Sequence, residues 1–383
     1  MAYVEEINRI EDLAVYRPLW HRLLAETQRA SFFHTLEWLE IYWKHFGAGQ
    51  KLRTLIVFSR QGPSGILPLV VRREATKVGR LRILTYPLHD WGSFYGPLGA
   101  DPMATLAAGL EHCRRSPRDW DIMELRWIGR TACEPTARAM RSAGFHPKQS
   151  VWNRTAVVEF AGTFDDYTAG QTGKWRSNHR RYERSLAKLG DVVYLRYRPG
   201  GELLGEADPR WDLYDACEAI ARRSWQGAST DGTTLTHPSV RPFFREAHAA
   251  AAKAGMVDLN LLYLAGQPSA FAYNYRCSDR VYGLRAGYDA AVFREGAGGA
   301  LLVRTIEDGF ERGDGLFDLG VGSLQGKRHL ATRMVPIFRC SHYPLAVPRA
   351  QLVRLKRWTQ QWLSDRGRWG NRRARPRHEK SNA

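Results

Sequence analysis

The chain has 383 residues, of which 44% are hydrophobic and 13 are tryptophan, so it can bury the cores of two domains and is not an intrinsically disordered protein. No apolar run approaches the roughly 20 residues of a membrane-spanning helix, and the first residues lack the basic-then-apolar order of a signal peptide. The five scattered cysteines form no CxxC or Cys/His cluster, which argues against a disulfide framework and a structural zinc. We therefore expect a cytoplasmic protein with no transmembrane segment and no metal.

The formal net charge of +18 is concentrated in two short stretches. Residues 174–188 hold six Arg/Lys and one Glu, and residues 366–383 hold seven Arg/Lys and one Glu. The second stretch has no apolar period and is predicted to be a disordered tail, with an anionic membrane surface, nucleic acid or an acidic protein as candidate partners. The alternative is a solvated tail without a dedicated partner.

Hydrophobic periodicity divides the first half of the chain into alternating helices and strands. Helices are predicted at 11–27, 35–46, 102–115 and 134–143, and strands at 52–59, 65–73, 80–86, 93–98, 121–128 and 151–160.

The second half begins with a basic helix and contains three strands in meander order. Helices are predicted at 174–189, 210–224, 238–254, 299–312 and 347–364, and strands at 191–198, 256–266, 268–277, 280–289, 316–320 and 333–343. In each half a meander is followed by a helix and a strand that returns to the sheet. This order predicts an α+β fold with a mixed sheet rather than a doubly wound one.

The predicted organisation is a domain at 1–162, a second domain at 163–346, a helix at 347–365 and the tail at 366–383.

The segment after the third meander strand is a candidate phosphate site. The strand 281–288 runs through a loop with Gly296, Gly298 and Gly299 into a helix, and Arg294 adds a charge. Unpaired N–H groups and the positive end of a helix dipole favour an anion there, and glycines let it approach the backbone. The spacing is that of neither the P-loop nor the dinucleotide fingerprint, and a tight turn without a ligand is the alternative.

Four stretches in the second half resemble motifs of a known protein family: KWRSNHRRYERSLAKLG (174–190), LLYLAGQPSAFAYNYR (261–276), YGLRAGYD (282–289) and FDLGVGSLQGKRHL (317–330). Residues 165–330 resemble the GNAT-superfamily acyltransferase domain of the CelD type, found in bacterial proteins linked to cellulose and exopolysaccharide synthesis. That family is akin to the Fem peptidyltransferases, which place two GNAT units in tandem. The chain departs from the GNAT pyrophosphate signature [QR]xxGx[GA], which is not met in strict register.

The resemblance implies tandem GNAT-like domains and an acyl-CoA donor such as acetyl-CoA. It also implies an amine or hydroxyl acceptor on a cell-envelope or exopolysaccharide precursor, of the cellulose type for instance. Two alternatives stay open. One is a Fem-like transferase that takes an aminoacyl group from tRNA, although no segment reads as the long helical arm of such enzymes. The other is a non-catalytic scaffold of polysaccharide synthesis.

Three residues are candidates for this chemistry. Asp318, flanked by apolar residues in LFDLG, is the candidate general base, and the alternative is a carboxylate that caps a turn or pairs with Arg. Tyr288 could protonate the leaving thiolate, or be a core residue. Lys327 could offset the charge of a donor phosphate, or lie at the surface.

The basic helix offers candidates for binding an anionic acceptor. Its apolar stripe should pack on the domain and leave Arg176, Arg180 and Arg181 on other faces, where they could hold an anionic small molecule or glycan precursor. The alternative is a solvated cationic face. Trp225 could line the acceptor cleft or pack in the core.

Overall fold

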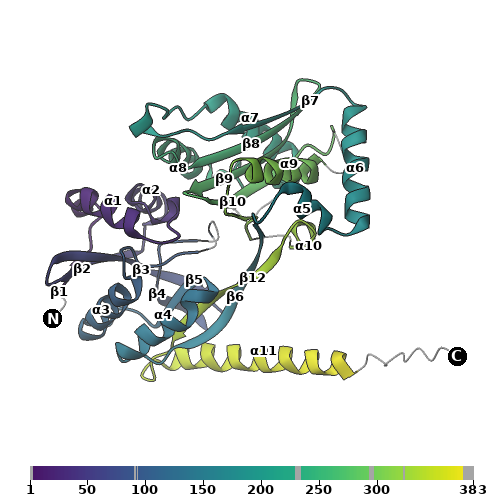
Figure 1. The fold of residues 1–383 in the computed structure, drawn as a ribbon. Coiled ribbons are helices and arrows are strands. Elements are labelled where there is room, and N and C mark those ends of the chain that lie inside the picture. Colours follow the sequence, from purple (N-terminus) through teal and green to yellow (C-terminus); the bar gives the residue numbers. More distant parts are fainter. Residues whose placement is uncertain are drawn as a thin grey trace.

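The computed structural model describes residues 3–89, 92, 94–228, 234–292, 297–321 and 324–373, with the backbone alone at 297, 361 and 364–373. Twelve strands form one mixed sheet in these ranges, in the order β1-β2-β3-β4-β5-β12-β6-β11-β10-β9-β8-β7. Helices cover the sheet (Figure 1). The predicted α+β class with a mixed sheet is confirmed.

The first half contributes six strands and the helices between them. In chain order these are β1 (Tyr3–Ile7), η1 (Glu11–Tyr16), α1 (Arg17–Glu26), η2 (Phe32–His34), α2 (Leu36–Phe46), β2 (Lys51–Ser59), β3 (Gly62–Thr76), β4 (Gly79–Thr85), α3 (Pro102–Arg115), β5 (Ile122–Ile128), α4 (Arg130–Ser142) and β6 (Lys148–Glu159).

The second half contributes the other six strands and the longest helix. In chain order these are α5 (Phe164–Ala169), α6 (Gly173–Ala187), β7 (Val192–Tyr197), η3 (Glu202–Leu204), α7 (Trp211–Arg223), η4 (Trp225–Ala228), α8 (Arg241–Lys253), β8 (Val257–Leu264), β9 (Gln267–Cys277), β10 (Arg280–Tyr288), α9 (Ala297–Glu311), β11 (Leu316–Asp318), α10 (Leu324–Lys327), β12 (Arg333–His342) and α11 (Pro348–Arg373).

The two halves repeat one arrangement. In each, three strands pair antiparallel in sequence, a helix follows the third, and the next strand pairs parallel with that third strand. The parallel pairs are β4–β5 and β10–β11, with α3 and α9 as the respective crossover helices. The structure therefore has the tandem organisation that the sequence led us to expect.

The sheet is continuous because the halves exchange strands. β12, the last strand of the chain, lies between β5 and β6, while β6 also pairs with β11. Residues 333–343, which the sequence assigns to the second half, thus complete the sheet of the first. Sequence periodicity cannot reveal such an exchange, because it reports which face of a strand is buried and not which neighbour it pairs with.

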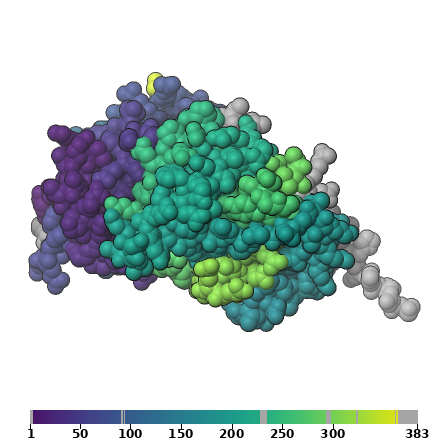
Figure 2. Space-filling model, turned by 90° about the horizontal axis from the view of Figure 1, so that it is seen from above, coloured from purple at the N-terminus to yellow at the C-terminus, as the bar shows by residue number. Residues whose placement is uncertain are grey.

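Aromatic residues join the halves above the sheet. Thr35 caps α2 by accepting a hydrogen bond from the Trp38 backbone N–H, and the helix then buries Trp38 against Phe243 of α8 with ring centroids 5.2 Å apart. Phe32 contacts Tyr275 of β9 at 4.8 Å. In the space-filling view the purple N-terminal segment lies directly against the teal-green surface of the second half (Figure 2).

Some element predictions were wrong or incomplete. Of the predicted strand 93–98, the described residues make one isolated bridge, between Leu98 and Ile66. β1, α5 and α10 were not predicted. Helix α11 runs to Arg373, so residues 366–373 of the predicted tail are helical, while 374–383 lie outside the described residues.

Candidate functional site

The centre of the second half is a place where two parallel strands part. β10 and β11 pair from Arg280 to Tyr282, the latter opposite Asp318. Just beyond this pair the two backbones are still in close contact at Gly283 and Gly320. A Cβ atom built on Gly320 would lie only 2.4 Å from the Gly283 carbonyl oxygen. β10 then has an irregularity between Gly283 and Arg285, and among the described residues its remainder pairs with β9 alone. We call this divergence, bounded by Gly283 and Gly320, the open fork.

Asp318 lies at the base of the open fork and is fully buried. Its Oδ1 accepts hydrogen bonds from the Thr155 hydroxyl and, at 2.9 Å, from the Gly320 backbone N–H. Because paired residues of parallel strands point to the same face, Asp318 and Tyr282 both face the first half. Asp318 thus shapes the turn that follows β11, which is the capping role named as the alternative to a base.

Lys327 of α10 lies at the same fork. Its Nζ donates hydrogen bonds to the carbonyl oxygens of Gly320 at 3.1 Å and Val321 at 3.3 Å. Burial lowers the pKa of the Lys327 ammonium to about 8; the Asp318 carboxylate opposes this shift and the Arg285 guanidinium reinforces it. The structure therefore brings the predicted residues Asp318 and Lys327 together, and adds Arg285, which the sequence did not single out. The only sequence signal for Arg285 is a cation between the apolar residues Leu284 and Ala286.

The N-terminus of α9 lies at the far end of β10. A Cβ on Gly298 would come within 3.0 Å of the Tyr288 ring, whereas a Cβ on Gly299 would meet no atom within 4 Å. No acidic residue occupies the first turn of α9, so no side-chain carboxylate in that turn competes for its N–H groups. A diphosphate at this end of the helix stays a prediction from the sequence. The predicted phosphate ligands Arg294 and Gly296 lie outside the described residues.

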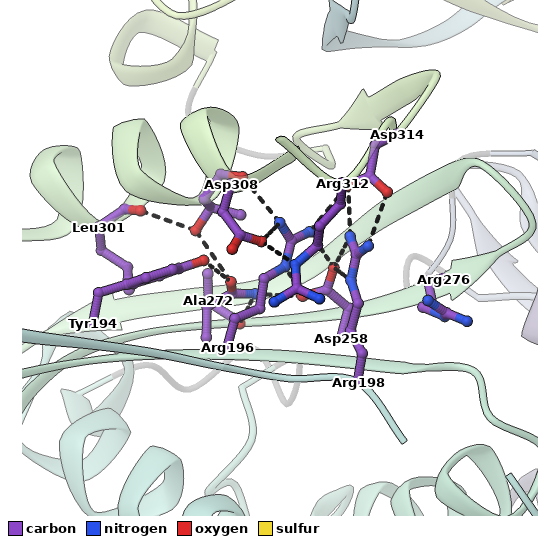
Figure 3. Close-up of polar contacts among 12 residues, drawn as sticks. Tyr194, Arg196, Arg198, Asp258, Ala272, Arg276, Leu301, Asp308, Arg312 and Asp314 are labelled. Carbon is purple, nitrogen blue, oxygen red and sulfur yellow. Dashed lines mark hydrogen bonds and ion pairs between the residues drawn. The ribbon is translucent and has the colours of Figure 1, made fainter. Parts of the chain in front are cut away.

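A buried polar network holds α9 on the sheet (Figure 3). Arg196 of β7 donates to Asp258 of β8 at 2.5 Å and to Asp308 of α9 at 2.7 Å, and Arg198 joins Asp258 to Asp314 at 2.7 and 2.6 Å. Burial alone would raise the pKa of Asp258, but the charges of Arg196 and Arg198 lower it to about 2. These contacts fix the C-terminal part of α9 and thereby the direction in which its N-terminus points.

Tyr288 is not close to Asp318. It packs with Leu186 and Ala300 on the face of the sheet covered by α6 and α9, opposite the face of Asp318 and Tyr282. Six residues of strand also separate it from Tyr282, which corresponds to about 20 Å. The two predicted catalytic residues therefore do not share a site in this structure.

The predicted acceptor-binding residues are dispersed. The Arg176 guanidinium donates to the carbonyl oxygens of Thr168, Ala169 and Gln171 and so binds the end of α5. Arg180 and Arg181 are exposed on α6, on the side of the second half away from the first half (Figure 1).

Trp225 is also exposed, at the start of η4 after α7. Its role as an acceptor residue stays a prediction.

A cavity of about 890 Å³ lies between the halves, between α1 and α8. Its wall includes Arg29 and Ala30, whose carbonyl oxygens both accept from the Tyr282 hydroxyl at 3.4 Å. Tyr282 of β10 therefore contacts the wall of the cavity without lining it. None of the predicted acceptor residues lines this cavity, which also includes His21, Lys253, Asp279 and Arg280.

Comparison with known proteins gives a match for the second half. Residues 173–328 match the profile of the acetyltransferase (GNAT) domain. The chain matches none of the curated proteins with which it was compared.

Solved structures share the fold over most of the chain. FemX is 12% identical, with 92% of this chain and 99% of FemX covered and a TM-score of 0.58. The C-terminal domain of an Agrobacterium fabrum protein described as a lysylphosphatidylglycerol synthetase is 13% identical, with 78% and 86% covered and a TM-score of 0.51. A Bacteroides thetaiotaomicron protein of unknown function is 11% identical, with 89% and 100% covered and a TM-score of 0.51.

None of the helices in the described ranges has the length and hydropathy needed to cross a bilayer. The described residues likewise include no group of three or more His, Cys, Asp or Glu side chains placed to hold a metal ion. Residues 173–328 thus match a GNAT-type acetyltransferase domain, within a fold that nearly the whole chain shares with FemX.

Proposed function

We propose that the second half transfers an acyl group from acyl-CoA, with acetyl-CoA as the simplest donor, to an amine or hydroxyl of a cell-envelope or exopolysaccharide precursor. The observation that carries this proposal is the open fork, with Lys327 at its base and the glycine start of α9 at the other end of β10. A donor of this class is a cytoplasmic metabolite, so a cytoplasmic location belongs to the proposal.

The donor fits along β10. The N–H groups at Gly298 and Gly299 would bind the diphosphate. The edge of β10 from residue 284 to 288, which pairs with β9 alone among the described residues, offers backbone groups to the amides of the pantetheine arm, as in strand addition. When bound, acyl-CoA supplies the activated acyl carbon.

Lys327 is the best-placed group for proton transfer. With its pKa near 8, a useful fraction of the amine is neutral close to physiological pH, and it can take the proton of the attacking acceptor nitrogen or oxygen. The new bond forms to the acyl carbon as the C–S bond breaks, and the thiolate leaves with the electron pair. Asp318 acts as a positioning residue, because it is buried and holds the Gly320 turn to which Lys327 is bound.

The cavity between the halves and the fold likeness support the acceptor class. The cavity between the halves is large enough for a sugar or peptide portion and lies on the Asp318 face of the sheet. The fold likeness to FemX and to a protein described as a lysylphosphatidylglycerol synthetase favours a cell-envelope acceptor. The CelD-type assignment and a cellulose-type precursor remain predictions from the sequence.

A second candidate is transfer of an aminoacyl group from tRNA. The fold shared with FemX over 92% of the chain and the cationic α6 favour it. Against it, the described residues contain no pair of long antiparallel helices that could form the expected arm, since α11 is a single helix.

Titration calorimetry with acetyl-CoA and longer acyl-CoA thioesters tests the proposal. We expect one site per chain, weakened at least about tenfold by Gly299→Trp, which fills the open space at the start of α9. Gly96→Trp is the matched control, because a side chain there also meets open space, in the first half. Failure to bind any thioester, with retention of tRNA, would favour the second candidate, and binding of neither would favour a scaffold.

A further inference from the structure

Helix α11 combines a buried face with an apolar face that points away from the protein. Ala350 and Val353 pack against Leu81, Ile83 and Ile122 of the sheet. Arg357, one turn further along the same side, reaches the buried Glu124. These contacts fix the rotation of the helix about its axis.

The opposite side of α11 carries large apolar side chains. With 3.6 residues per turn, they fall within one sector facing away from Ala350 and Val353. All are between 43% and 61% exposed: Leu352, Leu355, Trp358, Trp362 and Leu363. Single exposed apolar residues are ordinary, but five on one helical face form a continuous patch.

Cations border this apolar face. Arg354 and Lys356 flank it, and across its length α11 has eight Arg/Lys against one acidic residue, Asp365. Partial desolvation and the neighbouring Lys77 ammonium, in the turn between β3 and β4, lower the pKa of Lys356. Two ammonium groups placed side by side favour an anion that can lie across both.

We propose that α11 binds the surface of an anionic lipid bilayer, lying in the interface with its leucine and tryptophan side chains inserted and its cations at the lipid headgroups. Leu and Trp on one face with Arg and Lys at its borders is the arrangement of interfacial helices, and Trp favours the headgroup level. This inference is independent of the acyl transfer proposed above.

Other partners fit the helix less well. Nucleic acid would bind the cations but leave the leucine face in water. A second copy of the chain would place two helices of the same strong positive charge together. A bilayer with anionic headgroups satisfies both the apolar face and its charged borders.

Co-sedimentation of the full chain with vesicles tests the proposal. We expect binding to phosphatidylcholine vesicles that contain about one-third phosphatidylglycerol, and much weaker binding to phosphatidylcholine alone. The double variant Leu355→Glu/Trp358→Glu should raise the apparent dissociation constant at least about tenfold. Val15→Glu, at an exposed valine of η1, is the matched control and should bind like the parent protein.

Unchanged vesicle binding of the double variant would overturn the proposal, as would a complete loss of binding on deletion of residues 374–383 alone. Dimerisation of the parent protein through this face, or RNA binding that the double variant loses while vesicles are ignored, would also overturn it. Leu355 and Trp358 are exposed, so we expect the double variant to fold like the parent protein. An unchanged melting temperature checks this.

Discussion

The two repeats differ most where their parallel strands part. In the second half, β10 and β11 diverge beyond Gly283 and Gly320, and Lys327 lies at the base of the opening. In the first half, β4 and β5 pair parallel at Ile83 and Leu84 and then also diverge. The first divergence, however, is filled by the chain itself.

The segment after β4 returns to occupy the gap. The Tyr95 backbone N–H donates to the Trp127 carbonyl oxygen at 3.0 Å, and Leu98 exchanges hydrogen bonds with Ile66 of β3. The Tyr95 ring stacks on His34 at 4.7 Å and lies 5.1 Å from Tyr86. We call this arrangement the closed fork.

The crossover helices show the same contrast. Asp101 caps α3 by accepting from the backbone N–H groups of Met103 and Ala104 at 3.2 and 3.0 Å. Asp101 thus places a carboxylate at the capping position of α3, whereas α9 has Gly298 and Gly299 in its first turn and its capping position lies outside the described residues. The first repeat thus fills its fork with its own chain, whereas among the described residues β9 alone pairs with β10 beyond its divergence from β11.

The largest expected effect comes from the open fork. Lys327→Gln should lower kcat/KM by about 10²- to 10⁴-fold, because no neutral amine remains to take the acceptor proton. In the parent enzyme the rate should rise as pH increases through about 8, the pKa at which Lys327 becomes neutral, and Lys327→Arg should abolish this inflection. Tyr95→Phe in the closed fork is the control, and an equal loss there would remove the functional distinction between the forks.

The network that orients α9 should dominate stability. Asp258→Asn is expected to lower the free energy of unfolding by about 3–5 kcal/mol in urea titrations, since it leaves Arg196 and Arg198 buried with too little negative charge. Because the pKa of Asp258 is lowered when folded, its contribution is present above its unfolded pKa of about 4 and declines as pH falls toward 2. Asp212→Asn, in an exposed pair with Arg210, should cost less than about 1 kcal/mol.

Asp318→Asn should separate positioning from proton transfer. We expect kcat to fall about tenfold to a hundredfold with donor affinity intact, as the Gly320 turn loosens. Loss of the carboxylate charge should also lower the pKa of Lys327 and move the pH inflection below about 8. Calorimetry with acetyl-CoA and pH–rate profiles measure both effects, and an unshifted inflection with normal kcat would exclude Asp318 from the site.

The smallest effect is expected at the closed fork. Asp101→Ala removes the cap of α3 and should cost about 1 kcal/mol of stability. It should leave the calorimetric stoichiometry at one acyl-CoA per chain, because Tyr95 and Leu98 still fill the gap. A second bound donor in this variant would show that the cap alone had closed the first repeat.

Part of the candidate site could be read from the chain. Asp318 and Lys327 were singled out because an acid within an apolar run and a lysine after a glycine bend are unusual, and the structure places both at one fork. Tyr288 was chosen because it ends the strand before the glycine loop, but the β-bulge between Gly283 and Arg285 turns it to the face opposite Tyr282 and Asp318. The cavity near Tyr282 could not be foreseen because it depends on packing between the halves, and Arg285 comes near Lys327 only when the second half has folded.

The sequence by itself determined the α+β class, the meander order and the repeat, because hydrophobic periodicity and turn residues act locally along the chain. Only the tertiary structure decided that β12 joins β5 and β6, that residues 94–98 fill one fork while no described residue pairs in the other, and that α11 turns its leucines outward. These features depend on which distant backbone and side-chain groups meet, and the pattern of apolar residues along a chain is the same for many such pairings.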